Sequence, residues 1–393
     1  MPGLLTKYPP TAADLRIGDI IKARRSNRPH KDCLDDIAGY FQTKHPFGFN
    51  SGRTALYALL KACLPAGSGV VLPGYTCYTV AAAVVRAGMK VILSDSDPND
   101  LGYNIKTLQK TLTQHSNIKA IVACHLFGLT LDLNKIRKIA GSDTLIIDDA
   151  AQSCGIQTGD HQSGTGGDVG FYSFGRGKPL SISGGGLLVT DNDDISDKVK
   201  KLIADEFEPD QTSLGSMMKA AVYNPAVHPL GFNLASRLPG IKLAQNRFDP
   251  EFPVSTLSEF KARLLAGILP RLDKMNQDRQ MAASQLENLI GNRSGISIPR
   301  SKLDGRPGNL RFPILIDDSE LRLRVLRKGR QWGFSSMYPT ALNGLPSIAE
   351  GNNIDLPGAE RIARTIVTLP THRHILHALQ NDSITDKLAR LWR

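Results

Sequence analysis

Three short stretches of the sequence carry residue types that could do chemistry together. Residues 50–56 form a small-residue turn that opens a helix, and the free backbone N–H groups at such a start can cradle a phosphate. Asp148 and Asp149 end an apolar stretch, which is where ligands bind in open α/β sheets. Ser173 precedes a glycine-loosened loop that carries Lys178, and a lysine in a closed pocket can become a nucleophile toward carbonyl groups.

Each stretch alone has an ordinary structural explanation. A Ser-Gly turn often only caps a helix, and one of two adjacent acids can serve as a helix N-cap. A single lysine is by default a surface residue. The glycine run at residues 184–186 is explained by a tight turn before the next strand.

The order of the stretches is more specific than any one of them. An anion site comes first, then a strand-end carboxylate about a hundred residues later, and then an amine. Pyridoxal 5′-phosphate needs these three parts for its phosphate, its ring nitrogen and its aldehyde. The sequence therefore predicts a pyridoxal phosphate site.

An alternation of short apolar runs and helical patterns would position these residues. Strands are predicted at residues 69–73, 90–95, 120–128, 144–150, 170–174 and 185–190. Helices are predicted at residues 50–64, 79–88, 105–114 and 132–141. Strands that alternate with helices indicate an α/β fold, with a mainly parallel sheet covered on both faces.

The second half of the chain has a different pattern. Residues 205–255 are rich in proline and lack a clear period, which predicts an irregular connector near a domain boundary. Residues 257–291 predict a long helix with a kink at Pro270, followed by a strand at 310–316, a helix at 319–333 and a final helical stretch. We therefore expect a large domain at residues 1–245, with an N-terminal arm, and a smaller α+β domain at residues 246–393.

Composition limits the class of protein. The 393 residues are 41% hydrophobic and 22% charged, which excludes intrinsic disorder, a collagen-like repeat and a disulfide-stapled miniprotein. Five scattered cysteines without CxxC spacing indicate neither a disulfide framework nor a zinc site, so no metal is expected. Neither a secretory signal nor an apolar run of about 20 residues is visible, which favours a cytoplasmic location.

The net charge of +11 suggests an anionic partner. Nucleic acid is not the expected one, because the basic cluster at residues 22–28 is short and lacks interleaved aromatic residues. A diphosphate-bearing small molecule fits the charge. The apolar, lightly basic residues 217–243 could contact a membrane surface, although a dimer contact or a lid is the plainer expectation.

From about residue 35 to residue 375, the sequence resembles the DegT/StrS family of pyridoxal phosphate-dependent nucleotide-sugar aminotransferases. This family has the aspartate-aminotransferase-like fold (fold type I). The motifs of the family have counterparts in chain order. These are SGTxAL at residues 51–56, PsfT at 73–76, FvDvdp at 93–98, VHlyG at 124–128, EDaAQ at 148–152, GtfGD at 164–168, SFxxxK at 173–178, YP at 338–339 and sLP at 369–370. The resemblance implies a PLP-dependent aminotransferase (a transaminase).

The resemblance also implies a role for each matching residue. Lys178 would be the catalytic residue, binding the cofactor aldehyde covalently and later shuttling the substrate proton. Asp149 would pair with the ring nitrogen, and Gln152 would lie near the phenolic oxygen. The phosphate would be held by Ser173 and by the helix start of residues 52–54, namely Gly52, Arg53 and Thr54, where Arg53 replaces the usual threonine.

Other positions have less certain counterparts in the family pattern. His125 would line the cofactor pocket, or would be a buried hydrogen-bonded histidine. The ring-stacking aromatic residue of the family aligns with Cys77, so the stacking is weaker here or passes to Tyr78 or Tyr75. Tyr338, in the YP motif, would contact the substrate.

Several departures concern the substrate layer and not the cofactor. The Glu of the family's Glu-Gly-Gly is Gly184 here, and its Asn-Tyr-Arg-Met stretch, through which a second subunit completes the pocket, has no clear counterpart. The leading hypothesis is transfer of an amino group from glutamate to a keto-sugar nucleotide, by a homodimer, for amino-sugar or surface-polysaccharide biosynthesis. Alternatives are a dehydratase-like sugar-modifying enzyme, or a non-catalytic regulatory protein that binds PLP or a nucleotide sugar.

Overall fold

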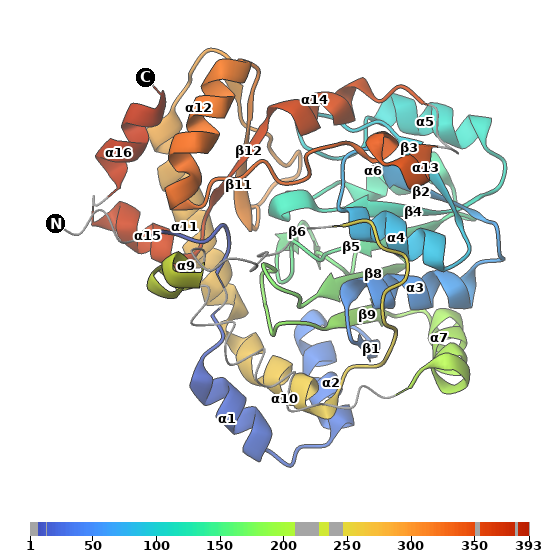
Figure 1. Cartoon of the computed structure of the whole chain (residues 1–393). Coiled ribbons are helices and arrows are strands. Elements are labelled where there is room, and N and C mark those ends of the chain that lie inside the picture. The colour runs from blue at the N-terminus through green and yellow to red at the C-terminus, as the bar shows by residue number, and fades with distance from the viewer. Residues whose placement is uncertain are drawn as a thin grey trace.

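A seven-stranded sheet forms the centre of the protein (Figure 1). The structure is a computed structural model, and it describes residues 7–12, 14–208, 228–235, 247–349, 354–381 and 384–392. The strand order is β1-β9-β8-β5-β4-β2-β3. The strands are β1 (His45–Phe49), β2 (Gly69–Pro73), β3 (Lys90–Ser94), β4 (Ile118–Cys124), β5 (Leu145–Asp149), β8 (Val169–Ser173) and β9 (Gly186–Thr190).

Six of these strands run in one direction, and β9 runs in the opposite direction. Strands β3, β2, β4, β5 and β8 pair in parallel, whereas β9 runs antiparallel to both β8 and β1. The six strands predicted here are confirmed. Strand β1 was not expected, because its sequence contains proline and glycine, which weaken a strand signal.

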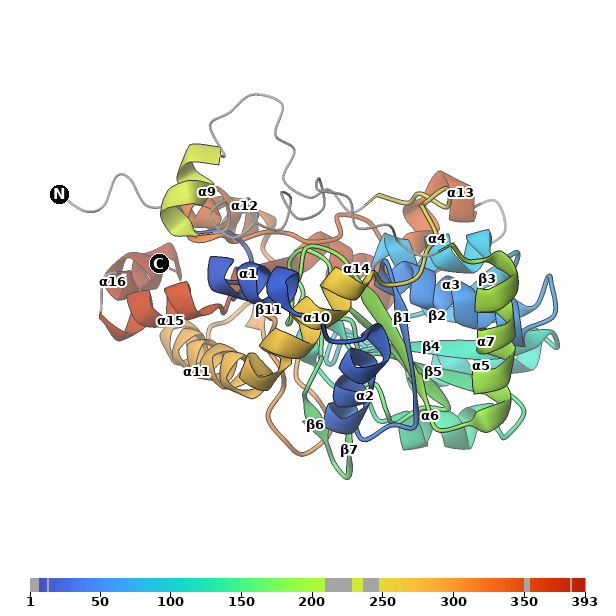
Figure 2. The ribbon, with the colours of Figure 1, turned by 90° about the horizontal axis from the view of Figure 1, so that it is seen from below.

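Helices cover both faces of the sheet, as the sequence pattern predicts. One face packs against α3 (Gly52–Cys63), α4 (Tyr78–Arg86) and α7 (Asp193–Glu206). The other packs against α5 (Ile105–Gln114) and α6 (Leu133–Ala140) over one half, and α2 (His30–Phe41) and α10 (Glu259–Ile268) over the other half. Figure 2 shows these layers from below, with α1 (Ile17–Arg25) beside α10.

A second unit is built on a small antiparallel sheet. It pairs β10 (Ile296–Ser297), β11 (Arg311–Ile316) and β12 (Ile366–Pro370). Helices α11 (Leu272–Ile290), α12 (Ser319–Gly329), α15 (Arg373–Gln380) and α16 (Thr385–Ala389) surround it (Figure 1). The predicted break at Pro270 is confirmed, since a 3₁₀ turn at Leu269–Arg271 separates α10 from α11.

The chain crosses back to the large sheet after the second unit's helix α12. The Leu342 N–H donates to the Gly74 carbonyl at 2.8 Å, and Asp95 accepts from the Gly358 and Ala359 N–H groups at the start of α14 (Pro357–Thr365). These bonds fix the segment before β12 on the strand ends of the large sheet. The domain boundary predicted between residues 245 and 246 lies outside the described residues.

The remaining described elements are short. They are the hairpin β6 (Gln157–Thr158) and β7 (His161–Gln162), α9 (Pro229–Ala235) and α13 (Pro346–Ala349). Within the described ranges, every helix is too short or too polar to span a lipid bilayer.

Candidate active site

Strand alternation places the two acids of β5 on opposite faces of the sheet. Successive side chains of a strand point to opposite faces. Ile147 lies in the core against α3 and α4, and Ile146 lies in the core against α5 and α6. Asp149 therefore shares the α3/α4 face with Ile147, and Asp148 points to the opposite face.

Asp148 contacts backbone N–H groups through one carboxylate oxygen and the His125 ring through the other. Its Oδ2 accepts hydrogen bonds from the Gly164 N–H at 2.8 Å and the Gly166 N–H at 3.1 Å. Its Oδ1 lies 2.8 Å from His125 Nε2, without the alignment of a hydrogen bond. Both side chains are buried. Asp148 thus holds the turn at residues 164–166 against the end of β5.

His125 has the buried position that was one of its two predicted alternatives. Its Nδ1 accepts the Leu131 N–H at 3.0 Å. An Nδ1 that accepts carries no proton, so the ring proton lies on Nε2 and faces the Asp148 carboxylate. A place for His125 beside the cofactor stays a prediction.

Asp149 is buried but much less engaged. Its Oδ1 accepts the Ala151 N–H at 3.0 Å. Burial raises the pKa of Asp149, while the positive charge of Lys178, the Ala151 N–H and the Cys124 thiol oppose that rise. The Lys178 amine thus interacts electrostatically with the Asp149 carboxylate, and their joint role in holding a cofactor stays a prediction.

Lys178 lies in a strained loop between β8 and β9. Its backbone N–H donates to the Gly175 carbonyl at 3.3 Å. Gly177 and Ser183 both have left-handed backbone conformations, with φ of 78° and 67°, and a non-glycine residue rarely adopts this conformation. Such strain is typical of loops that present a reactive group.

The helix start and the end of β8 meet closely enough to form an anion cradle. Ser51 caps α3 by accepting the Thr54 N–H at 3.2 Å. A Cβ added to Gly52 would lie 2.7 Å from Ser173 Cβ, so only glycine permits this approach. The cradle then consists of the Ser173 hydroxyl and the first N–H groups of α3, with Thr54's N–H already used by the cap.

The Arg53 side chain is directed to a segment far away in the sequence. Its guanidinium lies 4.7 Å from the centre of the Phe252 ring, and that of Arg86 lies 4.8 Å from the same ring. Burial lowers the pKa of Arg53. The Arg53 side chain therefore packs against Phe252, and the predicted part of its backbone N–H in the cradle stays a prediction.

Gln152 links two elements of the site. Its Oε1 accepts the Phe127 N–H at 3.1 Å, and its Nε2 donates to the Tyr338 hydroxyl at 3.3 Å. Phe127 has a φ of 56°, so Gln152 stabilises a strained turn after β4. The predicted contact of Gln152 with the cofactor stays a prediction, and the link to Tyr338 was not foreseen.

The aromatic residues near Cys77 are engaged with one another. The Tyr78 hydroxyl accepts the Thr340 N–H at 3.1 Å and lies 2.8 Å from Thr340 Oγ1. The Cys77 sulfur lies 3.0 Å from Thr79 Oγ1 and contacts the Tyr338 hydroxyl. Tyr75 is completely buried and packs edge-on against Tyr338.

The residues present fit pyridoxal phosphate. A glycine-dependent cradle, a buried carboxylate and a lysine amine come from the carboxyl ends of β5 and β8 and from the loop that follows β8. Sequence reasoning missed Cys124, which pairs in register with Asp149, and the segment that carries Phe252. Strand periodicity could have placed Cys124, because it ends β4 as Asp149 ends β5.

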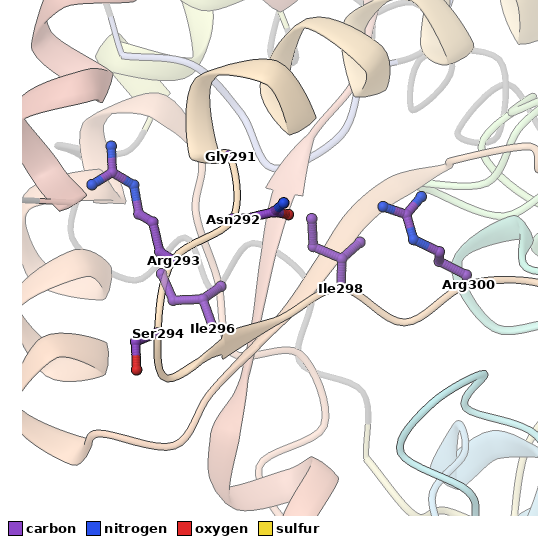
Figure 3. A pocket seen from close by; sticks show the side chains of 7 residues that line it. All are labelled: Gly291, Asn292, Arg293, Ser294, Ile296, Ile298 and Arg300. Carbon is purple, nitrogen blue, oxygen red and sulfur yellow. The ribbon is translucent and has the colours of Figure 1, made fainter.

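A surface pocket of about 460 Å³ lies elsewhere, at the end of α11. Figure 3 shows it between Arg293 and Arg300, with Ile296 and Ile298 between them. Arg293 donates to the Ile290 carbonyl at 2.7 Å, and Arg300 pairs with Glu287. None of the candidate site residues lines this pocket, so it is separate from the candidate active site.

The chain is similar in sequence to known proteins over most of its length. The chain is 26% identical over 367 residues to the Pleiotropic regulatory protein of Geobacillus stearothermophilus, covering 91% of this chain and 88% of the relative. It is 32% identical over 341 residues to the UDP-N-acetyl-3-dehydro-alpha-D-glucosamine 3-aminotransferase of Acidithiobacillus ferrooxidans, covering 85% of this chain and 81% of the relative.

A solved structure has the same fold. The GDP-4-keto-6-deoxy-D-mannose-3-dehydratase of E. coli with bound hydrated PLP matches with a TM-score of 0.76 at 17% identity, covering 99% of this chain and 100% of that chain. The model of the DegT/DnrJ/EryC1/StrS aminotransferase family matches residues 31–388. With a match over nearly its whole length, the chain belongs to the DegT/DnrJ/EryC1/StrS aminotransferase family.

Proposed function

We propose that this protein is a PLP-dependent aminotransferase that moves an amino group, with glutamate as the donor, onto a keto-sugar carried by a nucleotide. The proposal rests on the electrostatic interaction of the Lys178 amine with the buried Asp149 carboxylate and on the close approach of Gly52 to Ser173. The 32% identity to an aminotransferase named for a UDP-linked 3-dehydro sugar supports the substrate class. The net charge of +11 favours an anionic diphosphate.

Each residue then has a defined task. When bound, pyridoxal phosphate supplies an electron sink for negative charge that develops at the substrate carbon. The start of α3 and Ser173 bind the phosphate, and Asp149 holds a proton on the ring nitrogen. Lys178 Nζ would hold the cofactor at its aldehyde, and its amine would accept and return the proton of the substrate α-carbon.

The amine at position 178 separates two reaction types. The family resemblance implies histidine in place of the lysine in sugar dehydratases, and a sugar dehydratase of E. coli shares the fold of this chain. Lys178 supports transamination, because an amine both anchors the cofactor and accepts the substrate proton.

A regulatory role is the second candidate, and one observation favours it. A relative that matches 91% of this chain is named a pleiotropic regulatory protein. The missing Glu at Gly184 would also suit a protein that binds its ligand without turnover.

A half-reaction separates these possibilities. Purified protein is loaded with pyridoxal phosphate and mixed with excess glutamate, and the visible absorbance of the cofactor is followed. An aminotransferase converts the cofactor to its amine form and releases 2-oxoglutarate in equal amount. Retention of the starting spectrum, with no 2-oxoglutarate, would argue against transamination. Keto-sugar nucleotides added to the amine form then identify the acceptor.

The oligomer and the location belong to the same proposal. We expect a homodimer, because pockets of fold type I are usually completed by a second subunit, and we expect it in the cytoplasm. The membrane contact considered for residues 217–243 lies outside the described residues, except for α9 and His228. Sedimentation of the purified protein alone tests for the homodimer, and sedimentation with lipid vesicles tests for the membrane contact.

A further inference from the structure

Helix α11 reaches the loop between β8 and β9 through one buried side chain. Residues 174–185 form this loop, called the Lys178 loop below. Arg279 on α11 donates through Nη2 to the Pro179 carbonyl at 2.7 Å. Pro179 directly follows Lys178 and has no N–H of its own, so its carbonyl is the only backbone group with which it can form a hydrogen bond. The backbone next to Lys178 is therefore tied to α11.

The same face of α11 also holds the turn that follows β5. Asn276 donates through Nδ2 to the Cys154 carbonyl at 3.0 Å, and Cys154 lies in the turn after Asp149, the last residue of β5. Residues three apart on a helix are neighbours on its surface, and Arg279 Nη1 donates to Asn276 Oδ1 at 2.8 Å. One pair of side chains on α11 thus connects the Lys178 loop to the turn after β5.

This connection is made by buried polar groups. Arg279 and Asn276 are each 5% exposed, and both acceptors of the Arg279 guanidinium are neutral oxygen atoms. Burial lowers the pKa of Arg279 to about 10, so the side chain stays charged near neutral pH. An apolar side chain of similar volume avoids the desolvation cost of a buried charge. Packing alone therefore does not account for an arginine at this position.

The bonds inside the Lys178 loop give it a shape but not a place. The Ile182 N–H donates to the Phe174 carbonyl at 3.0 Å, and the Lys178 N–H donates to the Gly175 carbonyl at 3.3 Å. These bonds join residues of the loop to one another, so they do not position it relative to β5. The bond from Arg279 does, because its donor belongs to a helix that also holds the turn after β5.

We propose that Arg279 is a positioning residue that holds the Lys178 loop against the turn after β5, so that the Lys178 amine is presented to the cofactor. The part that concerns the cofactor rests on the proposed function. The bonds from α11 to the two carbonyl groups are a property of the chain alone, so their effect on the loop can be measured without the cofactor.

The first experiment measures hydrogen exchange of backbone amides in cofactor-free protein by mass spectrometry. Arg279→Met keeps an unbranched side chain but removes the donors. Amides of the Lys178 loop should exchange roughly 10-fold faster, as expected when a hydrogen bond from a charged donor is lost. Amides of β4, which lies inside the large sheet, should exchange as in wild type, because only the loop is released.

Arg293→Met is the matched control. Arg293 also donates to two carbonyl groups, those of Ile290 and Trp392, but it follows α11 in the second unit. Its substitution should leave exchange in the Lys178 loop unchanged. If Arg279→Met fails to fold, Arg279→Lys takes its place. That variant keeps the charge without the planar fork of donors, and it should also speed exchange in the loop.

The second experiment separates binding of pyridoxal phosphate from its covalent attachment. Borohydride trapping at successive times, followed by mass spectrometry of the Lys178 peptide, gives the rate of attachment at each cofactor concentration. In Arg279→Met, the rate at saturating cofactor should fall about 10-fold, because the amine is no longer held in place. The concentration that gives half of this rate should stay close to the wild-type value, since it depends on the cradle at Ser173 and the start of α3.

The outcomes separate the inference from the proposed function. Exchange in the Lys178 loop that does not change in Arg279→Met, or that rises equally in β4, overturns the inference even in a working aminotransferase. An unchanged rate of attachment also overturns it. Faster exchange with slower attachment in a protein that never converts glutamate overturns the proposed function and leaves the positioning role in place.

Discussion

Two aspartates at the end of β5, on opposite faces of the sheet, have different surroundings. On one face, Asp148 meets two backbone N–H groups and the His125 ring. On the other, Asp149 meets one backbone N–H, a thiol and the charge of a lysine. The role of each carboxylate follows from its surroundings and not from its residue type.

The difference has an energetic meaning. Hydrogen bonds to a charged acceptor contribute about 1.5–3 kcal/mol each, so Asp148 stabilises the turn at residues 164–166. A buried carboxylate with few partners costs stability, which the raised pKa of Asp149 reflects. Asp148 therefore stabilises the fold, whereas Asp149 lowers stability and is available for chemistry.

The largest expected effect is at the amine opposite Asp149. Lys178→Ala should abolish covalent attachment of pyridoxal phosphate and lower turnover by about 10³-fold or more, because the proton shuttle is lost. Lys200→Ala, an exposed lysine on α7, is the control and should keep full activity. Steady-state kinetics and the visible spectrum measure both. Full activity in Lys178→Ala would place the chemistry elsewhere.

The next effect is at Asp149 itself. Asp149→Asn should lower kcat by about 10²-fold, since the ring nitrogen loses its charged partner. The cofactor-free variant should at the same time melt roughly 2 °C higher than wild type, because an unfavourable buried charge is removed. Kinetics and differential scanning calorimetry test the two parts together.

Asp148→Asn should show the opposite pattern. It should lower the free energy of unfolding by about 3 kcal/mol, because charged acceptors of the Gly164 and Gly166 N–H groups are lost. Molecules that remain folded should still bind pyridoxal phosphate. Urea unfolding of both variants checks the comparison, and equal effects of the two substitutions would break it.

The cradle gives a smaller effect. Gly52→Ala should weaken binding of pyridoxal phosphate about 10-fold, or about 1.4 kcal/mol, because the added Cβ would lie 2.7 Å from Ser173 Cβ. Gly39→Ala in α2 adds a Cβ that meets no atom within 4 Å, and it serves as the matched control. Equilibrium dialysis with pyridoxal phosphate measures both variants, and equal affinities would remove the cradle from the site.

The smallest expected effect is on pH dependence. The folded-state pKa of Asp149 is raised, so the folded protein holds the proton more tightly than the unfolded chain does. The resulting stabilisation is complete below the unfolded pKa of about 3.9 and is lost as pH rises through the folded pKa. Cofactor-free wild type should therefore lose stability relative to Asp149→Asn as pH rises, and then level off. A constant difference across pH would contradict the raised pKa.

The order of elements could be predicted because its signals are local. Apolar runs and helical periods marked the strands β2–β5, β8 and β9, and Pro270 marked the break between α10 and α11. Strand β12 was missed and assigned to a final helical stretch. It is five residues long and follows α14 directly, so its strand form depends on pairing with β11, about fifty residues earlier.

Among the site residues, too, local sequence signals were predictive and contacts with distant segments were not. Lys178, Asp149 and Ser173 could be proposed because each ends a strand or follows one closely. The partners of Arg53 and Gln152 were not predictable, since Phe252 and Tyr338 reach them from distant parts of the chain. Sequence spacing identifies the groups that do chemistry, whereas tertiary packing decides which of them remain available.

The most direct test of the account is chemical. Holoenzyme is treated with borohydride, which fixes the cofactor to the amine that holds it, and the digested protein is mapped by mass spectrometry. The pyridoxyl mass should appear on Lys178. In Asp149→Asn protein loaded with equal cofactor, the label on Lys178 should fall only as much as cofactor binding falls. Label on another lysine, or none in protein that binds the cofactor, would contradict the assignment of Lys178.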